Sequence, residues 1–289
     1  MYVNHKFGDY ILEPIGIIVK RESSLAEEVA LKVVKVLDSF NVKFLIEENV
    51  EYKSLSDYSK FNLQDYVPGK LIVIGGDGTL LRTLLKIQDK TPIIMGVRAG
   101  KRGFLLDVER YEVEERVKDF LHGRYKVIEY PRLSVYANNR KLYCILNDSV
   151  VISKMAKMVR LTVSIDGQTA MRIDGDGVVV STTVGSTAYG LSAGGPIIDP
   201  RLNVILVAPL NPVQLHLRPI VIPGDSLIEI SLTAQSNEAY LSLDGQIVEE
   251  LRPGSTIAIG PCPISVRIAR FRWWENFYEK LYTRVLTYW

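Results

Sequence analysis

The sequence holds few of the residues that bind metals or form disulfides. Its 289 residues include two cysteines, Cys144 and Cys262, and three histidines, His5, His122 and His216. Neither cysteine has a partner at the spacing of a metal-binding motif and the histidines are scattered, which argues against a zinc site. Both cysteines lie in strand-like segments, so we expect two buried, reduced thiols in a cytosolic protein.

Long apolar runs and an excess of charge of one sign are also missing. No apolar run approaches the roughly 18 residues of a membrane-spanning helix, and residues 1–6 lack the apolar core of a signal peptide. The net charge of +2 is too balanced to favour nucleic acid or an anionic membrane as a partner. We therefore expect a cytoplasmic protein that binds neither nucleic acid nor membranes.

The first part of the chain alternates short apolar segments with amphipathic ones. We predict strands over residues 15–19, 42–46, 71–74 and 93–97, and helices over residues 25–40, 79–87 and 113–121. Residues 48–66 are predicted to form a loop or a weak helix. This alternation predicts an α/β domain over residues 1–124 with a parallel, Rossmann-like sheet, whose ligands bind at the carboxyl ends of its strands.

From residue 126 the sequence changes to strands joined by tight turns. We predict strands over residues 143–146, 159–165, 177–181, 204–207, 227–232, 240–243, 257–259 and 264–268. These strands predict an all-β sandwich domain over residues 125–269. Residues 270–289 return to a helical pattern rich in aromatic residues, namely Trp273, Trp274, Phe277, Tyr278, Tyr282, Tyr288 and Trp289. We expect this helix to complete the first domain or to pack on another subunit.

A glycine turn that carries one acid follows the apolar segment at residues 71–74. It reads Gly75-Gly76-Asp77-Gly78-Thr79. The glycines allow close approach of the backbone to a ligand, and the start of the predicted helix offers free N–H groups that suit a phosphate. Asp77 would repel such a phosphate by about 4 kcal/mol at ~4 Å and an effective dielectric constant of ~20.

The presence of Asp77 therefore indicates a hydroxyl group, a metal ion or a proton in transit. A kinase that phosphorylates a sugar hydroxyl supplies all three. The alternative interpretation is a tight strand-to-helix turn in which Asp77 is solvated.

Residues 174–196 form the densest cluster of glycines and small polar residues in the chain. The cluster contains an acid pair, an apolar strand, a run of hydroxyl residues and Gly194-Gly195. Small residues let a flat ring approach the backbone, and hydroxyl and N–H groups can then contact the edge of that ring. Taken alone, the segment fits a crowded turn at the rim of a sandwich equally well.

Together, the two motifs resemble the NAD kinase family. Further matching pieces occur in the same order, namely Gly96-Val97…Gly100…Gly103-Phe104, Asn147-Asp148, Pro209…Pro212…Leu215…Arg218-Pro219 and Asp244-Gly245-Gln246. The resemblance covers residues 71–268. Gly-Gly-Asp-Gly alone is shared with diacylglycerol kinase, sphingosine kinase and phosphofructokinase relatives, whereas the second motif is much more specific.

The resemblance implies a two-domain enzyme that phosphorylates the 2′-hydroxyl of the adenosine ribose of NAD, producing NADP. It implies a divalent cation such as Mg²⁺, ATP or polyphosphate as the phosphoryl donor, and a homodimer or homotetramer. Asp77 would be the catalytic residue that orients or deprotonates the hydroxyl. The resemblance assigns donor phosphates to Gly75, Gly76, Gly78 and Thr79, and NAD to Asp77, Gly78, Phe104, Asn147, Asp148, Asp176, Thr187, Ala188, Tyr189, Ser192 and Asp244. No residue is assigned as a direct metal ligand.

Three basic residues, Arg98, Lys101 and Arg102, cluster in the loop at residues 96–103. We expect them to bind phosphates of the donor or the 2′-phosphate of the product, because guanidinium groups pair with phosphate bidentately. The alternative is a solvated basic loop.

Two other functions share parts of these patterns. A lipid kinase would use the same Gly-Gly-Asp-Gly turn, but it would give no reason for the cluster at residues 174–196. A non-catalytic dinucleotide-binding protein would need neither Asp77 nor Asn147.

Overall fold

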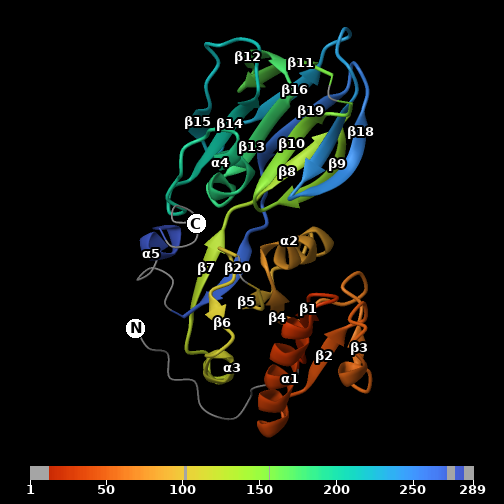
Figure 1. Cartoon of the computed structure of the whole chain (residues 1–289), viewed down its shortest axis with the longest axis vertical. Coiled ribbons are helices and arrows are strands. Elements are labelled where there is room, and N and C mark those ends of the chain that lie inside the picture. The colour runs from red at the N-terminus through yellow and green to blue at the C-terminus, as the bar shows by residue number, and fades with distance from the viewer. Residues whose placement is uncertain (1–12, 101–102, 156, 272–276, 283–289) are drawn as a thin grey trace. The chain divides into compact units, whose positions relative to one another are not determined.

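The computed structural model describes residues 13–100, 103–155, 157–271 and 277–282. The chain divides into two compact units (Figure 1). Unit 1 contains Lys90–Ile128 and the described parts of residues 1–80 and 267–289, and unit 2 contains Leu81–Asp89 and Glu129–Val266. Among the described helices, none combines the length and the apolar character needed to cross a membrane.

Unit 1 is built on a sheet with the strand order β3-β2-β1-β4-β5-β20-β7, in which β6 also pairs with β5. The strands are β1 (Ile15–Val19), β2 (Phe44–Glu47), β3 (Lys60–Phe61), β4 (Lys70–Gly75), β5 (Ile93–Arg98), β6 (Val108–Glu109), β7 (Lys126–Tyr130) and β20 (Val266–Arg270). All strands except β7 are joined by parallel pairings with resolved registers. The predicted parallel α/β fold is thus confirmed.

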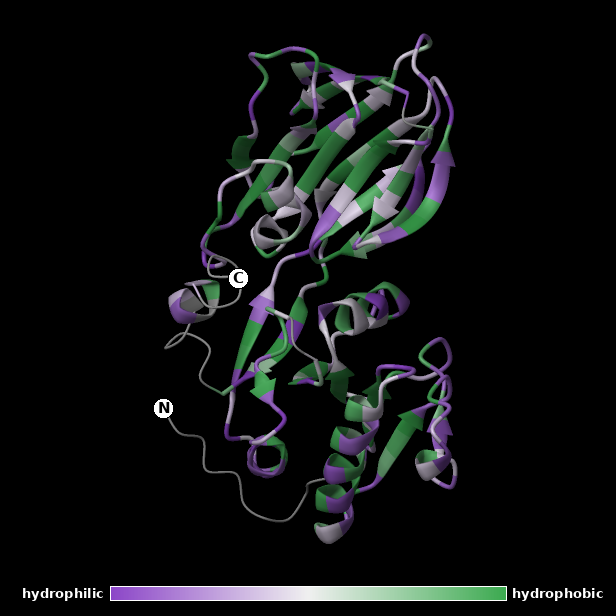
Figure 2. Ribbon diagram, in the orientation of Figure 1, coloured by the Kyte–Doolittle hydropathy of each residue, from purple (hydrophilic) through white to green (hydrophobic). Residues whose placement is uncertain are grey.

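Helices α1 (Ser24–Ser39) and α3 (Val113–Leu121) share one core with this sheet. Helix α1 begins after Ser23, whose Oγ accepts a hydrogen bond from the N–H of Ala26 at 3.3 Å. Val33 of α1 and Phe120 of α3 are fully buried in the same cluster as Ile72 of β4. Figure 2 shows the hydrophobic residues concentrated in the strands and on parts of these helices. A short helix, α5 (Phe277–Leu281), follows β20.

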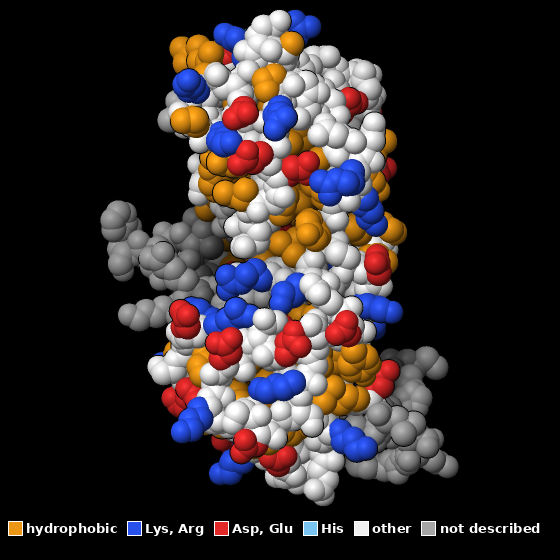
Figure 3. All heavy atoms as spheres, turned by 90° about the vertical axis from the view of Figure 1, so that its right-hand side faces the viewer, with side chains coloured by type: hydrophobic (Ala, Val, Ile, Leu, Met, Phe, Trp, Pro, Cys, Tyr) orange, Lys and Arg blue, Asp and Glu red, His pale blue; other side chains and the backbone are white. Residues whose placement is uncertain are grey.

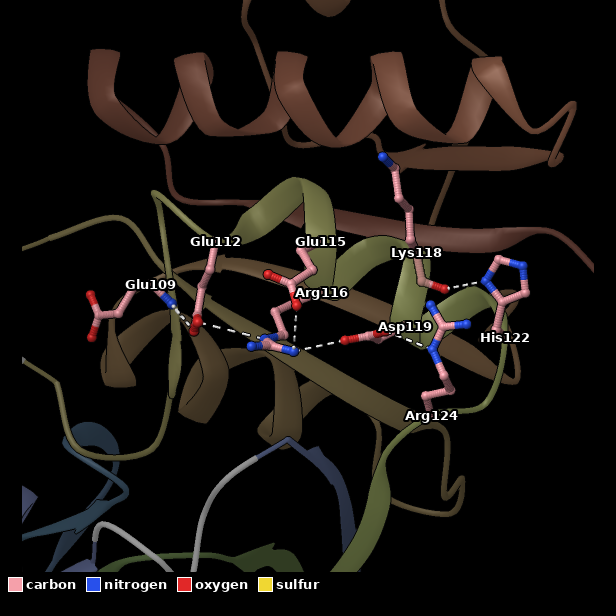
Figure 4. Close-up of polar contacts among 8 residues, drawn as sticks. All are labelled: Glu109, Glu112, Glu115, Arg116, Lys118, Asp119, His122 and Arg124. Atoms are coloured by element: carbon pink, nitrogen blue, oxygen red, sulfur yellow. Dashed lines mark hydrogen bonds and ion pairs between the residues drawn. The ribbon is translucent and has the colours of Figure 1, made fainter. Parts of the chain in front are cut away.

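A network of ion pairs covers α3 (Figure 4). The guanidinium of Arg116 contacts Asp119 at 2.7 Å and Glu112 at 3.5 Å, and Arg124 contacts Asp119 at 2.8 Å. Burial opposes ionisation of Asp119, but hydrogen bonds from Arg124 and Arg116 outweigh it and lower the pKa of this carboxyl group. The network stabilises the helix and its C-terminal turn.

Unit 2 is a sandwich of two antiparallel sheets, as predicted. One sheet has the order β15-β14-β13-β10-β17-β18 and the other β12-β11-β16-β19-β8-β9. The first contains β10 (Asp148–Ser153), β13 (Gly177–Thr182), β14 (Val204–Leu210), β15 (Ile220–Pro223), β17 (Ala239–Leu243) and β18 (Gln246–Leu251). The second contains β8 (Leu133–Ala137), β9 (Arg140–Ile145), β11 (Val159–Ile165), β12 (Gln168–Gly175), β16 (Ile228–Leu232) and β19 (Thr256–Pro261).

Residues from both sheets fill one core, to which Val180 and Val207 contribute from one sheet and Val163 and Ile257 from the other. Strand β13 is buried on both faces, because a second cluster that includes Ile198 covers its other side. Helix α4 (Tyr189–Ser192) and the 3₁₀ turn η2 (Gly185–Thr187) follow β13. Figure 3 shows acidic and basic side chains interspersed on one face of the molecule, in keeping with the small net charge.

Several elements differ from the prediction. The strand predicted over residues 264–268 was counted with the sandwich, but β20 pairs in parallel with β5 in the sheet of unit 1. Residues 48–66 contain a 3₁₀ turn, Lys53–Leu55, and the short strand β3. The strands that were missed are β6, β7, β8, β10, β12, β15 and β18. Of the aromatic tail, Trp273, Trp274, Tyr288 and Trp289 lie outside the described residues.

The prediction of two reduced thiols is wrong. Cys144 of β9 and Cys262, which directly follows β19, form a disulfide with a Cα–Cα distance of 6.1 Å. The two cysteines are 118 residues apart, and they meet because β9 and β19 both pair with β8. Spacing along the chain gives no sign of such a pairing. Disulfides are rare inside most cells but common in intracellular proteins of hyperthermophiles.

Candidate active site

The glycine turn lies between β4 and α2 (Asp77–Lys86), at the carboxyl end of the parallel strand. At Gly75 an added Cβ would lie 2.4 Å from the Oγ1 of Thr79, so the buried threonine side chain requires glycine there. At Gly78 an added Cβ would meet no described atom within 4 Å. The turn is therefore packed tightly at its first glycine and open at its third, where a ligand can approach the helix N-terminus.

Asp77 is held by two backbone groups from the loop after β5. Its Oδ2 accepts a hydrogen bond from the N–H of Phe104 at 2.7 Å, and its Oδ1 accepts one from Leu105 at 2.9 Å. An added Cβ at Gly103 would approach the Oδ1 of Asp77 to 3.1 Å. Each carboxylate oxygen has two lone pairs, so both keep capacity for a further donor. The structure thus brings predicted residues Asp77 and Phe104 together, and adds Leu105, which the sequence did not indicate.

The basic loop is only partly described. Arg98 forms an ion pair with Glu109 of β6, with Nη2–Oε2 and Nε–Oε2 distances of 2.5 and 3.1 Å. Arg98 is therefore paired with an acid and is not a solvated basic side chain. Phosphate binding by Arg98 stays a prediction. Lys101 and Arg102 lie outside the described residues.

In unit 2, the carboxylate of Asp244 organises the turn between β9 and β10. Asp244 accepts hydrogen bonds from the N–H groups of Leu146, Asn147 and Asp148 at 2.8, 2.7 and 3.2 Å. Burial raises the pKa of Asp244. The hydrogen bonds from the three N–H groups and the nearby positive charge of Arg132 lower it, but burial has the larger effect. NAD binding by Asp244 itself stays a prediction, and its hydrogen bonds hold the backbone of Leu146 and of two other predicted NAD-binding residues, Asn147 and Asp148.

The side chain of Asn147 offers an acceptor for a ligand. It is 8% exposed, and among the described residues its Oδ1 has no hydrogen-bond partner. An unmade hydrogen bond of this kind costs about 1–3 kcal/mol. The backbone of Asn147 is fixed, because its carbonyl accepts from the N–H of Thr182 at 2.9 Å. The site therefore holds a positioned acceptor whose partner a ligand hydroxyl or amino group can supply.

Asp148 is a buried carboxyl group with an unusual titration. Burial raises its pKa from 3.8 to about 7, and the neighbouring charge of Asp244 adds to the effect, while the N–H of Tyr189 opposes it. Asp148 therefore changes charge near neutral pH.

This titration predicts a pH-dependent stability. Below about pH 4 Asp148 is protonated in both the folded and the unfolded chain. As the pH rises to about 7, only the unfolded chain loses the proton, so the free energy of unfolding falls by on the order of 4 kcal/mol and then levels off. We expect Asp148→Asn to be more stable than the unsubstituted protein at pH 8, by an amount that shrinks towards pH 4.

Denaturant unfolding between pH 4 and 8 measures this difference. Asp225→Asn, which neutralises an exposed acid of the same unit, is the control and should track the unsubstituted protein. A constant difference between Asp148→Asn and the unsubstituted protein over this range would contradict the assignment.

Two of the remaining predicted residues, Tyr189 and Ser192, line a pocket of about 430 Å³ in unit 2. Its lining includes Tyr189, Ser192, Ala193, Pro209, Asn211 and Leu217. The Nδ2 of Asn211 donates to the Oδ2 of Asp176 at 2.8 Å, so Asp176 lies beside the pocket.

Two further predicted residues, Thr187 and Ala188, directly precede α4, which carries Tyr189 and Ser192. Asn211 was missed by the sequence analysis, although an asparagine before a proline is a known turn signal.

The described residues contain no cluster of three or more histidine, cysteine, aspartate or glutamate side chains that could hold a metal ion. Mg²⁺ is commonly bound through one or two carboxylates together with substrate phosphates.

A glycine turn at the end of a parallel strand with an acid at the helix start, in one unit, and a pocket in the sandwich of the other unit are typical of a nucleotide-binding phosphotransferase. The ATP-NAD kinase N-terminal domain model matches residues 69–125, and the ATP-NAD kinase C-terminal domain model matches residues 146–271. Relatives match over nearly the full chain. The NAD kinase of Aeropyrum pernix is 54% identical over 276 residues, which are 95% of this chain and 99% of that protein. The NAD kinase of Thermococcus kodakarensis is 33% identical over 89% of this chain and 93% of that protein. The chain belongs to the NAD kinase family.

Solved structures agree with this assignment. Yeast NADH kinase complexed with NADH has a TM-score of 0.88 over 96% of this chain and 88% of that chain, and at 23% identity it supports the fold. The NAD kinase of Archaeoglobus fulgidus in complex with ATP has a TM-score of 0.76 at 25% identity, over 95% of this chain and 100% of that chain. The family predicted from the two motifs is confirmed, and the protein is a kinase. Neither the lipid-kinase nor the binding-protein alternative is favoured.

Proposed function

We propose that the protein transfers the γ-phosphoryl group of ATP to the 2′-hydroxyl of the adenosine ribose of NAD, producing NADP. The observation that carries this proposal is Asp77, which begins α2 beside the open glycine position Gly78. ATP is preferred over polyphosphate as the donor because the related kinase of Archaeoglobus fulgidus was solved with ATP.

Asp77 is the base in this proposal. The 2′-oxygen attacks the γ-phosphorus, the bond from that phosphorus to the bridging oxygen breaks, ADP leaves, and the hydroxyl proton passes to the carboxylate. Phosphoryl transfer needs little covalent participation by the protein, so positioning dominates. The hydrogen bonds from Phe104 and Leu105 hold the carboxylate in one orientation before the substrate arrives.

Donor binding is assigned to the glycine turn. Gly75, Gly76, Gly78 and Thr79 present backbone groups at the start of α2, where phosphate oxygens are favoured. Arg98 and the loop residues Lys101 and Arg102 supply positive charge. Mg²⁺ fits this site as an ion held mainly by the donor phosphates, with Asp77 as the carboxylate at the turn. When bound, it neutralises charge that develops on the transferred group.

Dinucleotide binding is assigned to unit 2. Asn147 presents its unpaired Oδ1, and Tyr189 and Ser192 line the pocket together with Ala193. Asp148 begins β10, Asp176 lies between β12 and β13, and Thr187 and Ala188 directly precede α4. In this proposal Asp244 acts through the backbone of Asn147 and Asp148. A homodimeric or homotetrameric state and a cytoplasmic location, both expected from the sequence, stay predictions.

The first test is NADP formation with purified protein, NAD and Mg²⁺, and either ATP or polyphosphate as donor. We expect turnover with ATP, and weaker or no turnover with polyphosphate. NADH in place of NAD measures the acceptor preference, and a diacylglycerol or sphingosine substrate tests the lipid-kinase alternative.

Absence of NADP in a folded protein that still binds NAD would overturn the proposal in favour of a binding protein. Turnover of a lipid without turnover of NAD would overturn it in favour of a lipid kinase.

A further inference from the structure

A buried ion pair lies behind the loop that holds Asp77. The guanidinium Nη1 of Arg270, the last residue of β20, contacts the Oδ1 of Asp107 at 2.5 Å. The two side chains are only 1% and 4% exposed. Neither residue belongs to the motifs that carry the family resemblance.

The same guanidinium also fixes the backbone beside Asp77. Nη1 of Arg270 donates to the carbonyl oxygen of Leu105 at 2.6 Å. Leu105 in turn donates its N–H to Asp77 at 2.9 Å. A continuous path of polar contacts therefore runs from Asp107 through Arg270 and Leu105 to the carboxylate of Asp77. All four residues belong to unit 1.

The backbone of this part of the loop lies outside the strands of the sheet. Residues 103–107 are not in a strand, and β6 begins only at Val108. Burial of the Leu105 and Leu106 side chains anchors the segment by packing, but apolar packing does not set the direction of an N–H group. Two directional hydrogen bonds to one rigid, planar guanidinium do.

We propose that Arg270 and Asp107 are positioning residues for Asp77: they orient the 104–105 backbone, and the backbone orients the carboxylate toward the acceptor hydroxyl. The inference rests on the role proposed for Asp77. Misplacement of a reacting group by ~1 Å can cost on the order of 100-fold in rate, so the effect of losing this anchor should appear in kcat. Substrate affinity should change little, because neither side chain is exposed to ligand.

The test compares three forms of the pair. Replacing one partner would leave an uncompensated buried charge, whereas replacing both by apolar residues of similar volume is often neutral for folding. We therefore expect Arg270→Met combined with Asp107→Leu to fold, to keep KM for NAD and ATP within about twofold, and to lose about 10- to 100-fold in kcat. Arg270→Lys keeps the positive charge and places an ammonium group, with its three N–H donors, toward the same two acceptors, so its kcat should fall less than that of the double variant.

A matched control exists in the same unit. Arg116 and Asp119 on α3 form another largely buried pair, at 2.7 Å, and Figure 4 shows their partners on and beside that helix. The corresponding double substitution, Arg116→Met with Asp119→Leu, should also fold, and it should keep kcat within about twofold at a temperature where the protein is folded.

Repeating the Arg270 and Asp107 substitutions in an Asp77→Asn background separates positioning from general structural damage. If the pair acts through Asp77, the double substitution changes kcat by less than about twofold in that background. An equal loss in both backgrounds, a loss confined to KM, or full kcat in folded double and Arg270→Lys variants would each overturn the inference. If Asp77→Asn itself retains full kcat, the proposed role of Asp77 fails instead, whatever the Arg270 variants show.

Discussion

Asp77→Asn is expected to lower kcat for NADP formation at least 100-fold. The substitution keeps the size of the side chain and removes the charge of its carboxylate. General base catalysis typically contributes 10²–10⁴-fold to the rate. One amide oxygen can still accept from the N–H of Phe104 or Leu105, so the loop keeps part of its anchorage. KM for NAD and ATP should change far less than kcat, because the lost interaction matters chiefly in the transition state.

Steady-state kinetics on the purified variant measures this effect, with NAD binding and thermal unfolding as checks of integrity. Asp65→Asn is a suitable control, because it removes the charge of an exposed acid in the same unit. That variant should keep kcat within about twofold. A folded Asp77→Asn protein that retains a tenth or more of the kcat would rule out Asp77 as the base.

Removing the Cys144–Cys262 disulfide is expected to have the largest effect on stability. The bridge closes a loop of 118 residues, and the loop-entropy model assigns about 5 kcal/mol to a loop of that length. Cys262→Ser should therefore lower the melting temperature by on the order of 10 °C, given 2–4 °C per kcal/mol for domains of 150–250 residues. Unit 2 contains both cysteines, so the loss should be confined to its unfolding transition.

Because the chain has only two cysteines, a variant that lacks one of them cannot form an intramolecular disulfide. A strong reductant should lower the melting temperature of the unsubstituted protein to that of Cys262→Ser. It should not change the melting temperature of the variant. Thiol titration before and after reduction confirms the redox state. If reduction exposes two thiols and the melting temperature does not move, the disulfide contributes nothing to stability.

The local sequence was sufficient for the main alternation of strands and helices in unit 1 and for the location of both motifs. Strands such as β1 and β4 are short apolar segments, and α1 has a serine cap and an apolar face, so neighbouring residues specify them. The glycine turn was also predictable, because it is contiguous in the chain and its residue types carry their own chemistry. The family resemblance followed from the same local patterns.

The strands that were missed depend on distant partners. Strand β10, which was missed, begins at Asp148 and pairs with β13 and β17. A strand near β20 was predicted but was assigned to the sandwich, whereas β20 pairs with β5 in unit 1. A segment of five or six residues does not by itself specify which sheet it joins, because strand pairing depends on contacts with residues far away in the sequence.

The sequence alone determined the family, the two motifs and the alternation of elements that builds each unit, because these are properties of neighbouring residues. Only the tertiary structure decided that Cys144 meets Cys262, that Asp244 holds the backbone of Asn147 and Asp148, and that Arg270 supports the loop that holds Asp77. Each of these contacts joins residues about 100 or more positions apart. Such contacts form because apolar burial places the strands, and hydrogen bonds then select the side chains that fit between them.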